Sequence, residues 1–92
     1  MYYVYVLYSL KDNKLYKGYT SDILKRLLRH NSGGNKSTAH RKPFVLVHVE
    51  QFEDKSDALK REKYLKTAEG GSKLNEFLKM QKILDENNLM RK

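Results

Sequence analysis

Three apolar segments of the chain have the length and composition of β-strands. Tyr2–Tyr8 reads Tyr-Tyr-Val-Tyr-Val-Leu-Tyr and holds no charged residue, which is typical of a central strand that is buried on both faces. Leu15–Thr20 follows a turn-forming cluster at 11–14 and predicts the second strand of a hairpin. Phe44–Phe52 is apolar enough for a third, internal strand. The pattern therefore predicts a three-stranded antiparallel sheet.

Alternation along the first two strands sorts their side chains onto the two faces of the sheet. Tyr3, Tyr5 and Leu7 share one face of the first strand, and Tyr16 and Gly18 share one face of the second. A glycine within a strand weakens it and usually marks a bulge or the close approach of another group. We therefore expect one of these two features at Gly18.

The segment after the second strand predicts a helix that ends at about Asn31. Thr20-Ser21-Asp22 supplies an N-cap and a first-turn acid, and Gly33-Gly34 stops the helix. Its apolar stripe consists of Ile23, Leu24, Leu27 and Leu28. At about 100° per residue, Arg26 and His30 fall on a common flank beside this stripe, so both should line the edge where the helix meets the sheet.

A second helix, predicted from about Ser56 to Thr67, carries an acid in the middle of its apolar side. That side consists of Ala58, Leu59 and Leu65, whereas Lys60, Lys63 and Tyr64 face away. A carboxylate aimed at a core is costly unless it is paired or binds a cation. Glu62 is therefore either half of an ion pair or a cation ligand.

The remaining segments predict a loop, a third helix and a tail. Residues 33–42 are polar and Gly-rich and predict a mobile surface loop. Glu69-Gly70-Gly71 should break the second helix, and Ser72 should cap a third. We expect one folded domain over residues 1–84 and a charged, fraying tail over residues 85–92.

The charge of the chain narrows its partners. Lys and Arg number 19 against 11 Asp and Glu, which gives a formal net charge of +8 and favours polyanions, with nucleic acid ahead of an anionic membrane. Cysteine is absent, which excludes disulfides and thiolate metal sites and favours a cytoplasmic location. No apolar run is long enough to span a membrane, so we expect no membrane partner.

From the pattern alone, each polar candidate also has a structural interpretation. Tyr5 and Tyr16 are either packed aromatics or reactive phenols, and Arg26 is either a solvated helix charge or an anion ligand. His30 is either a hydrogen-bonded edge histidine or a member of a site. His40 lies in the loop and is either exposed or in contact with phosphate, whereas we interpret the mid-strand residue His48 as structural.

Four segments together resemble a known family. They are Tyr3-Val4-Tyr5, Tyr16-Lys17-Gly18, the helix Leu-Lys-Arg-Leu-Leu-Arg-His at 24–30, and Ala-Leu-Lys-Arg-Glu-Lys-Tyr-Leu-Lys at 58–66. In this order and spacing they are similar to the GIY-YIG nucleases, and in particular to the small stand-alone bacterial type related to the amino-terminal nuclease of the excision-repair protein UvrC. The resemblance covers about residues 2–80.

The resemblance implies an α/β fold with a three-stranded antiparallel sheet flanked by helices. It also implies a metal-dependent endonuclease that acts on DNA in preference to RNA, with a structure-specific or DNA-repair role. It implies that Tyr5 is the tyrosine of the first motif and that Tyr16, in the second motif, is a general base or orients the attacking water. It implies that Arg26 contacts the phosphate and that His30 belongs to the site. Glu62 would be the single carboxylate that binds Mg²⁺ or Mn²⁺. Asn75 lies roughly where some members carry a further asparagine.

Basic residues around these positions are expected to bind nucleic acid. They are Lys17, Lys25, Arg29, His40 and Arg41. Two other functions share the charge pattern: a catalytically weak nucleic-acid-binding module with the same fold, and a basic domain with a protein or membrane partner.

Overall fold

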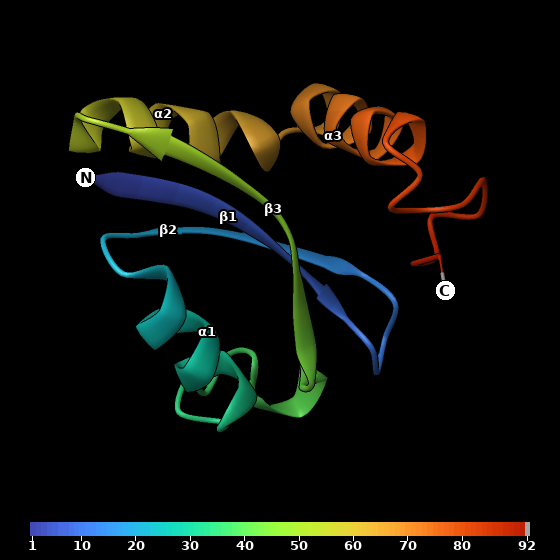
Figure 1. The fold of residues 1–92 in the computed structure, drawn as a ribbon, viewed down its shortest axis with the longest axis horizontal. Coiled ribbons are helices and arrows are strands. Elements are labelled where there is room, and N and C mark those ends of the chain that lie inside the picture. The colour runs from blue at the N-terminus through green and yellow to red at the C-terminus, as the bar shows by residue number, and fades with distance from the viewer. Residues whose placement is uncertain (92) are drawn as a thin grey trace.

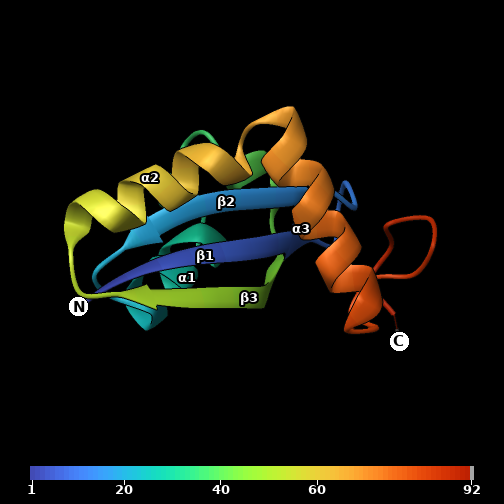
Figure 2. The same cartoon turned by 90° about the horizontal axis from the view of Figure 1, so that it is seen from above.

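The computed structural model describes residues 1–91 and consists of a three-stranded antiparallel sheet with helices on both faces (Figures 1 and 2). The strands are β1 (Tyr2–Ser9), β2 (Leu15–Thr20) and β3 (Phe44–Phe52), and the helices are α1 (Ile23–Asn31), the short 3₁₀ helix η1 (Ala39–Arg41), α2 (Lys55–Leu65) and α3 (Ala68–Met80). The longest of them, α3, has 13 residues, so no helix within residues 1–91 has the length that crossing a membrane requires. The predicted fold class is confirmed.

Strand β1 is the centre of the sheet, because the strand order is β2-β1-β3. Its residues from Val4 to Ser9 are all buried, as the prediction of a strand covered on both faces requires. Helix α1 covers one face, and α2 and α3 cover the other (Figures 1 and 2). The alternation of side chains therefore divides the interior into two cores.

The larger core lies under α2 and α3. It contains Val4, Val6 and Tyr8 from β1 together with Ala58, Leu65, Leu74, Leu78 and Leu84. The smaller core lies under α1 and contains Tyr5, Leu7 and Phe44, with Tyr16, Ile23, Leu27 and Leu46 packed against them. The small core holds two tyrosines among few aliphatic residues, so it is the more polar of the two cores.

Gly18 allows a close contact within this small core. It pairs with Tyr5 across the two strands, and a Cβ atom at position 18 would lie 2.5 Å from the phenolic oxygen of Tyr5. The Tyr5 side chain therefore crosses β2 at the one residue without a side chain. Of the two features expected at Gly18, the structure has the close approach. The one shift of register in the sheet lies between Val6 and Leu7, opposite β3.

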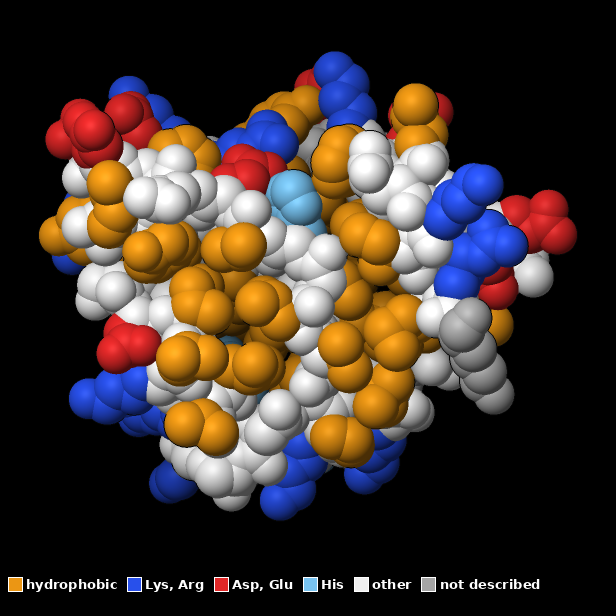
Figure 3. All heavy atoms as spheres, in the orientation of Figure 1, with side chains coloured by type: hydrophobic (Ala, Val, Ile, Leu, Met, Phe, Trp, Pro, Cys, Tyr) orange, Lys and Arg blue, Asp and Glu red, His pale blue; other side chains and the backbone are white. Residues whose placement is uncertain are grey.

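Strand β3 and helix α1 are less covered than the sequence predicts. Strand β3 is an edge strand rather than an internal one, and Val49 is 45% exposed. In α1, Ile23 and Leu27 reach the small core, whereas Leu24 and Leu28 are 74% and 70% exposed. A helix lying on a narrow sheet buries only its innermost row of apolar residues. Apolar side chains consequently gather on the face of the molecule that carries β3 (Figure 3).

The junction of α2 and α3 also differs from the prediction. Glu69-Gly70-Gly71 does not break a helix but forms the first turn of α3, which begins at Ala68. The N-cap is Thr67 rather than Ser72, because the Thr67 hydroxyl accepts a hydrogen bond of 3.0 Å from the amide of Gly70. Glycine is required there by packing, since a Cβ at position 70 would lie 1.9 Å from the carbonyl oxygen of Tyr64.

Two further side chains lie elsewhere than expected. Tyr64 does not face away from the protein but packs against the larger core. Beyond α3, Leu84 is buried in that core and forms a bridge with Met90, and the Arg91 amide donates to the carbonyl of Ile83. Residues 85–91 thus fold back onto the domain. Lys92 lies outside the described residues, and the predicted boundary between residues 84 and 85 stays a prediction.

Adjacent glycines in α3 give a test of this packing. Gly70→Ala should lower the free energy of unfolding by about 1–3 kcal/mol or more, because the new methyl group meets backbone atoms that cannot turn aside. Gly71→Ala should leave the stability unchanged or raise it by up to about 1 kcal/mol, since its nearest contact would be 3.4 Å away and alanine favours a helix. Urea denaturation of both variants measures the difference. Equal effects would contradict the close approach of α2 and α3.

Candidate functional site

Three buried polar side chains form a hydrogen-bonded chain beneath α1. The Tyr5 hydroxyl on β1 lies 3.0 Å from Nε2 of His30 on α1, and Nδ1 of His30 lies 2.8 Å from the hydroxyl of Thr38 in the loop after α1. All three residues are at most 2% exposed. A buried polar group is costly unless it is paired, and the chain pairs both ring nitrogens of His30.

Aromatic rings enclose this chain. The ring of Tyr16 on β2 meets that of His30 edge-on, with centroids 5.0 Å apart, and lies 6.3 Å from the ring of Tyr5. Phe44, at the start of β3, contacts His30 from another side at 5.6 Å. The two predicted phenols therefore lie side by side, with His30 against both of them.

The electrostatics of Tyr5 connect it to the other predicted residues. Burial raises the pKa of Tyr5 to about 12, and the neighbouring Tyr16 adds to the rise. The positive charge of Arg26 lowers the pKa of Tyr5, and the negative charge of Glu62 raises it further. Tyr16, Arg26 and Glu62 are therefore all within electrostatic reach of one phenol, although they come from β2, α1 and α2.

His30 is held neutral at pH 7. Burial lowers its pKa, and the nearby positive charges of Arg26 and Arg29 lower it further. A neutral imidazole has one N–H donor and one acceptor nitrogen, which suits a position between two hydroxyl groups.

The carboxylate of Glu62 lies within electrostatic reach of Tyr5. Its side chain is 14% exposed, and one of its oxygens lies 3.6 Å from the ammonium group of Lys66, one turn later, at the C-cap of α2. Residues 1–91 hold no group of three or more His, Asp or Glu side chains that could form a metal cage. A lone carboxylate fits a hard divalent ion that keeps most of its water and completes its ligands with phosphate oxygens. The donor set therefore suits Mg²⁺ or Mn²⁺ and does not suit zinc.

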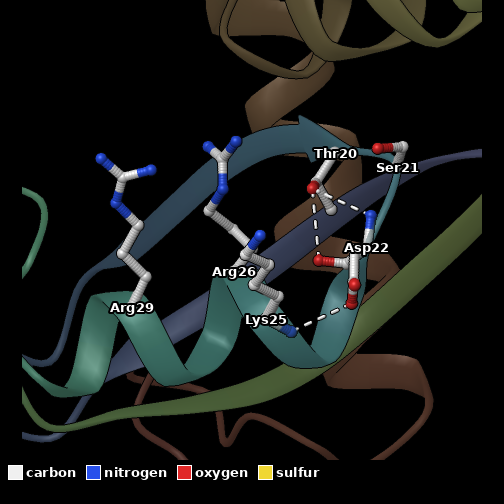
Figure 4. Close-up of a pocket in the computed structure, with 6 residues that line it drawn as sticks. All are labelled: Thr20, Ser21, Asp22, Lys25, Arg26 and Arg29. Atoms are coloured by element: carbon white, nitrogen blue, oxygen red, sulfur yellow. Dashed lines mark hydrogen bonds between the residues drawn. The ribbon is translucent and has the colours of Figure 1, made fainter.

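A basic hollow of about 340 Å³ opens beside Arg26 (Figure 4). Arg26 and Arg29 extend from the same side of α1, and Lys25 also lines the hollow (Figure 4). Within the described part of the chain, none of these three cations forms an ion pair. The acid beside them, Asp22, caps α1 by accepting from the amide of Lys25 at 3.0 Å. The hollow therefore has an excess of positive charge and can receive an anion.

The structure gives two of the predicted nucleic-acid-binding residues different surroundings. Arg41 pairs with Asp12 at 2.6 Å, and its Nη2 donates to the carbonyls of Lys14 and Leu15. Arg41 does not line the basic hollow, and its contact with nucleic acid stays a prediction. His40 is exposed on η1 next to it.

Lys17 and Asn75 lie apart from Arg26, in a second hollow of about 360 Å³ that they share with Lys14. Burial lowers the pKa of Lys17, and the charge of Lys66 lowers it further. His48 lines neither of these two hollows. Its Nε2 lies 2.8 Å from a carboxylate oxygen of Glu50, as expected of a structural residue.

Thr38 is a member of the cluster that the sequence did not indicate. It lies in a segment predicted to be a mobile surface loop, yet it is 1% exposed. The loop is held at its far end by the ion pair between Arg41 and Asp12. Nothing in the local pattern distinguishes Thr38 from the neighbouring polar residues, because its burial depends on a histidine eight positions earlier.

The chain is similar to known proteins along most of its length. A family model described as the GIY-YIG catalytic domain matches residues 1–75. A UPF0213 protein of Staphylococcus saprophyticus is 47% identical over 74 residues, which are 79% of this chain and 89% of the relative. For a UPF0213 protein of Clostridium perfringens the identity is 42% over 88 residues, 95% of this chain and 92% of the relative. The solution structure of the UPF0213 protein from Bacillus halodurans is 37% identical, with a TM-score of 0.52, and the match covers 84% of this chain and 85% of that one.

The buried phenol gives a prediction for alkaline stability. The pKa of Tyr5 rises from 10.0 to about 12, so the folded protein holds this proton more tightly than the unfolded chain does. The stabilisation is complete below about pH 10 and is lost as the pH rises through about 12. The wild type should therefore lose part of its advantage in unfolding free energy over Tyr5→Phe as the pH rises from about 9 to about 11. Denaturation of both proteins at each pH measures this difference. A constant difference would contradict the burial of this hydroxyl.

Proposed function

The chain belongs to the GIY-YIG family, a nuclease family, and on this premise we propose that it is a divalent-metal-dependent endonuclease that hydrolyses phosphodiester bonds in DNA. The observation that supports this most directly is the convergence on one buried phenol of Tyr16, Arg26 and Glu62, next to a basic hollow. Hydrolysis needs a positioned water, a proton acceptor and positive charge at the phosphate, and this set of groups can supply each of them.

Arg26 is the proposed ligand of the reacting phosphate. Its guanidinium presents a planar pair of donors that matches two phosphate oxygens, and it has no carboxylate partner among residues 1–91. Lys25 and Arg29 line the same hollow and would contact the flanking phosphates. Lys17 and the exposed His40 stay predicted contacts further along the strand. The net charge of +8 attracts the polyanion to this surface.

The two phenols have different proposed roles. Tyr5 keeps its proton, since burial raises its pKa to about 12, so it is a poor base and instead orients its neighbours. Tyr16, which lies beside it, is then the phenol that orients the attacking water and accepts a hydrogen bond from it. Water adds to phosphorus, the bond from phosphorus to one bridging oxygen breaks, and the water protons end on the two product groups. His30 has no direct contact with solvent and acts through Tyr5.

Glu62 is the proposed ligand of Mg²⁺ or Mn²⁺. When bound, such an ion supplies positive charge to the phosphoryl and leaving oxygens. Asn75, which lines a hollow together with Lys17, stays a predicted site residue. The role in DNA repair and the cytoplasmic location also stay predictions.

A second function is favoured by one specific contact. Lys66 lies 3.6 Å from Glu62, and a carboxylate that keeps this partner would not bind an ion. In that case the protein would be a nucleic-acid-binding module that cleaves poorly. The contact is longer than a close charge-assisted hydrogen bond, and the Lys66 side chain is half exposed, so water can take over the solvation of its ammonium group. A divalent cation would therefore displace the ammonium group at little cost.

Glu62→Gln tests the metal assignment. We expect this variant to lose metal-stimulated cleavage of linear and branched DNA by about 10²-fold or more, while binding is kept, because the only anionic ligand has become neutral. Glu69→Gln is a matched control: Glu69 also pairs with a lysine one turn later at 3.6 Å, but its side chain is 71% exposed. Cleavage is measured on a substrate panel with Mg²⁺ and with Mn²⁺. Wild-type turnover by Glu62→Gln would contradict the assignment, and no cleavage by the parent protein would favour the binding module.

The basic hollow gives a second test through binding. Arg29→Gln should weaken binding to DNA and lower the slope of log affinity against log salt by about one unit, because one phosphate contact is lost. The control variant Lys79→Gln also removes one positive charge, but on α3 rather than on α1, and should leave the slope unchanged. Fluorescence anisotropy at several salt concentrations measures both slopes. If the two variants behave alike, DNA does not follow this hollow.

A further inference from the structure

His30 joins two hydroxyl groups, and this makes its proton arrangement ambiguous at first sight. A hydroxyl can donate or accept, so the chain from Tyr5 through His30 to Thr38 can be built in either direction. In one direction Nδ1 carries the proton, and in the other direction Nε2 carries it. One end of the chain must be fixed by a group that can only accept or only donate.

The backbone carbonyl of Asn35 fixes that end. It lies 3.4 Å from the Thr38 hydroxyl and can only accept a hydrogen bond. With the Thr38 proton directed at this carbonyl, which also accepts from the Thr38 amide at 3.1 Å, the Thr38 oxygen would accept from His30 and the imidazole proton would be on Nδ1. Nε2 then has a free lone pair and accepts the proton of the Tyr5 hydroxyl. The direction of all three bonds follows from one carbonyl.

We propose that Thr38 is a positioning residue, which selects the Nδ1–H tautomer of His30 and thereby turns the Tyr5 proton inward and the lone pairs of the Tyr5 oxygen toward Arg26. This role of Tyr5 in turnover rests on the proposed nuclease function, whereas the tautomer does not. The tyrosine oxygen would then present an acceptor to the guanidinium, whose charge reaches Tyr5, and would favour the orientation that receives a phosphate.

The opposite tautomer would work against Arg26. With Nε2 protonated, the Tyr5 oxygen would accept from His30 and its own proton would point outward, toward a guanidinium that can only donate. Two donors would then face each other. A doubly protonated, charged ring would avoid this choice, but its surroundings do not favour that form. The groups that face it are Tyr5, Tyr16, Thr38 and Phe44, with Arg26 and Arg29 on its own helix, and among residues 1–91 no carboxylate pairs with it.

The tautomer is measured directly by long-range ¹H–¹⁵N correlation spectra of the wild-type protein at neutral pH. The sequence has three histidines, and His30→Gln assigns the signal of interest. We expect His30 to show a protonated Nδ1 and an unprotonated Nε2. A protonated Nε2, or a doubly protonated ring, would overturn the proposal. This measurement requires no cleavage activity, so it decides the tautomer even if the proposed function fails.

Variants of Thr38 test the link to turnover. Thr38→Val keeps the shape but cannot accept from Nδ1, so its spectrum should show a shift away from the Nδ1–H form, and kcat should fall by about tenfold or more with little change in KM. Thr38→Ser keeps a hydroxyl and should restore both the tautomer and most of the turnover. Ser37→Ala changes an exposed hydroxyl in the same loop and is the matched control.

Each combination of tautomer and turnover supports or overturns the proposal. Loss of the Nδ1–H signal together with a fall in kcat in Thr38→Val, reversed in Thr38→Ser, supports the proposal. Wild-type turnover in Thr38→Val after the tautomer has changed overturns the role of Thr38 in positioning Arg26. If Thr38→Val does not fold, the wild-type spectrum still supports or overturns the tautomer. A fall in kcat in Thr38→Ser, with Ser37→Ala unchanged, would overturn the role of the hydroxyl.

Discussion

The burial of the Tyr5 hydroxyl organises this small protein. Tyr5 lies on the central strand, and its phenol crosses β2 at Gly18, where a methyl group would leave no space. A hydroxyl in that position is costly unless it has a partner, and His30 supplies the partner at 3.0 Å. His30 in turn needs a group for its other nitrogen, which is Thr38. One buried oxygen therefore connects the centre of the sheet, the helix α1 and the loop that follows it.

This polar connection replaces much of the apolar packing that usually holds a helix on a sheet. Only Ile23 and Leu27 of α1 pack against the small core, and two of its leucines face solvent. The helix is also held at its last residue, because the Asn31 side chain both donates to and accepts from the backbone of Phe44, at 3.1 and 2.6 Å. Directional bonds fix the position of α1 more narrowly than a few aliphatic contacts would, and Arg26 is carried on this helix.

Positive charges outnumber negative charges around the phenol of Tyr5, and this excess lowers the stability of the fold. Arg26, Arg29 and Lys25 gather at one hollow, whereas the carboxylate of Glu62 reaches the phenol from α2, on the other side of the sheet. Like charges in one place destabilise a fold, and so does a half-buried lysine such as Lys17, whose pKa is lowered by burial and by Lys66. A bound polyanion would relieve both effects. The arrangement is consistent with a surface that gives up some stability in order to bind nucleic acid.

Local pattern was enough to establish the strands, the first helix and the family, because periodicity, capping residues and turn residues act over a few positions. The bounds of β2 and the place of β1 at the centre of the sheet followed from composition alone. The sequence also marked Gly18 as a bulge or a close approach, and the structure decided for the close approach. The motif residues Tyr5, Tyr16, Arg26 and Glu62 could be named from their spacing, although their roles stay proposals.

Tertiary structure decided what depends on contacts between distant segments. The start of α3 at Ala68 follows from the packing of Gly70 against the end of α2, which overrides the usual effect of two glycines. Arg41 is tied to Asp12, a residue 29 positions earlier, which holds the end of the loop after α1. Thr38 becomes buried because His30 requires a partner. In each case the sequence shows the polar or flexible residue, and only the folded chain supplies the atom that it meets.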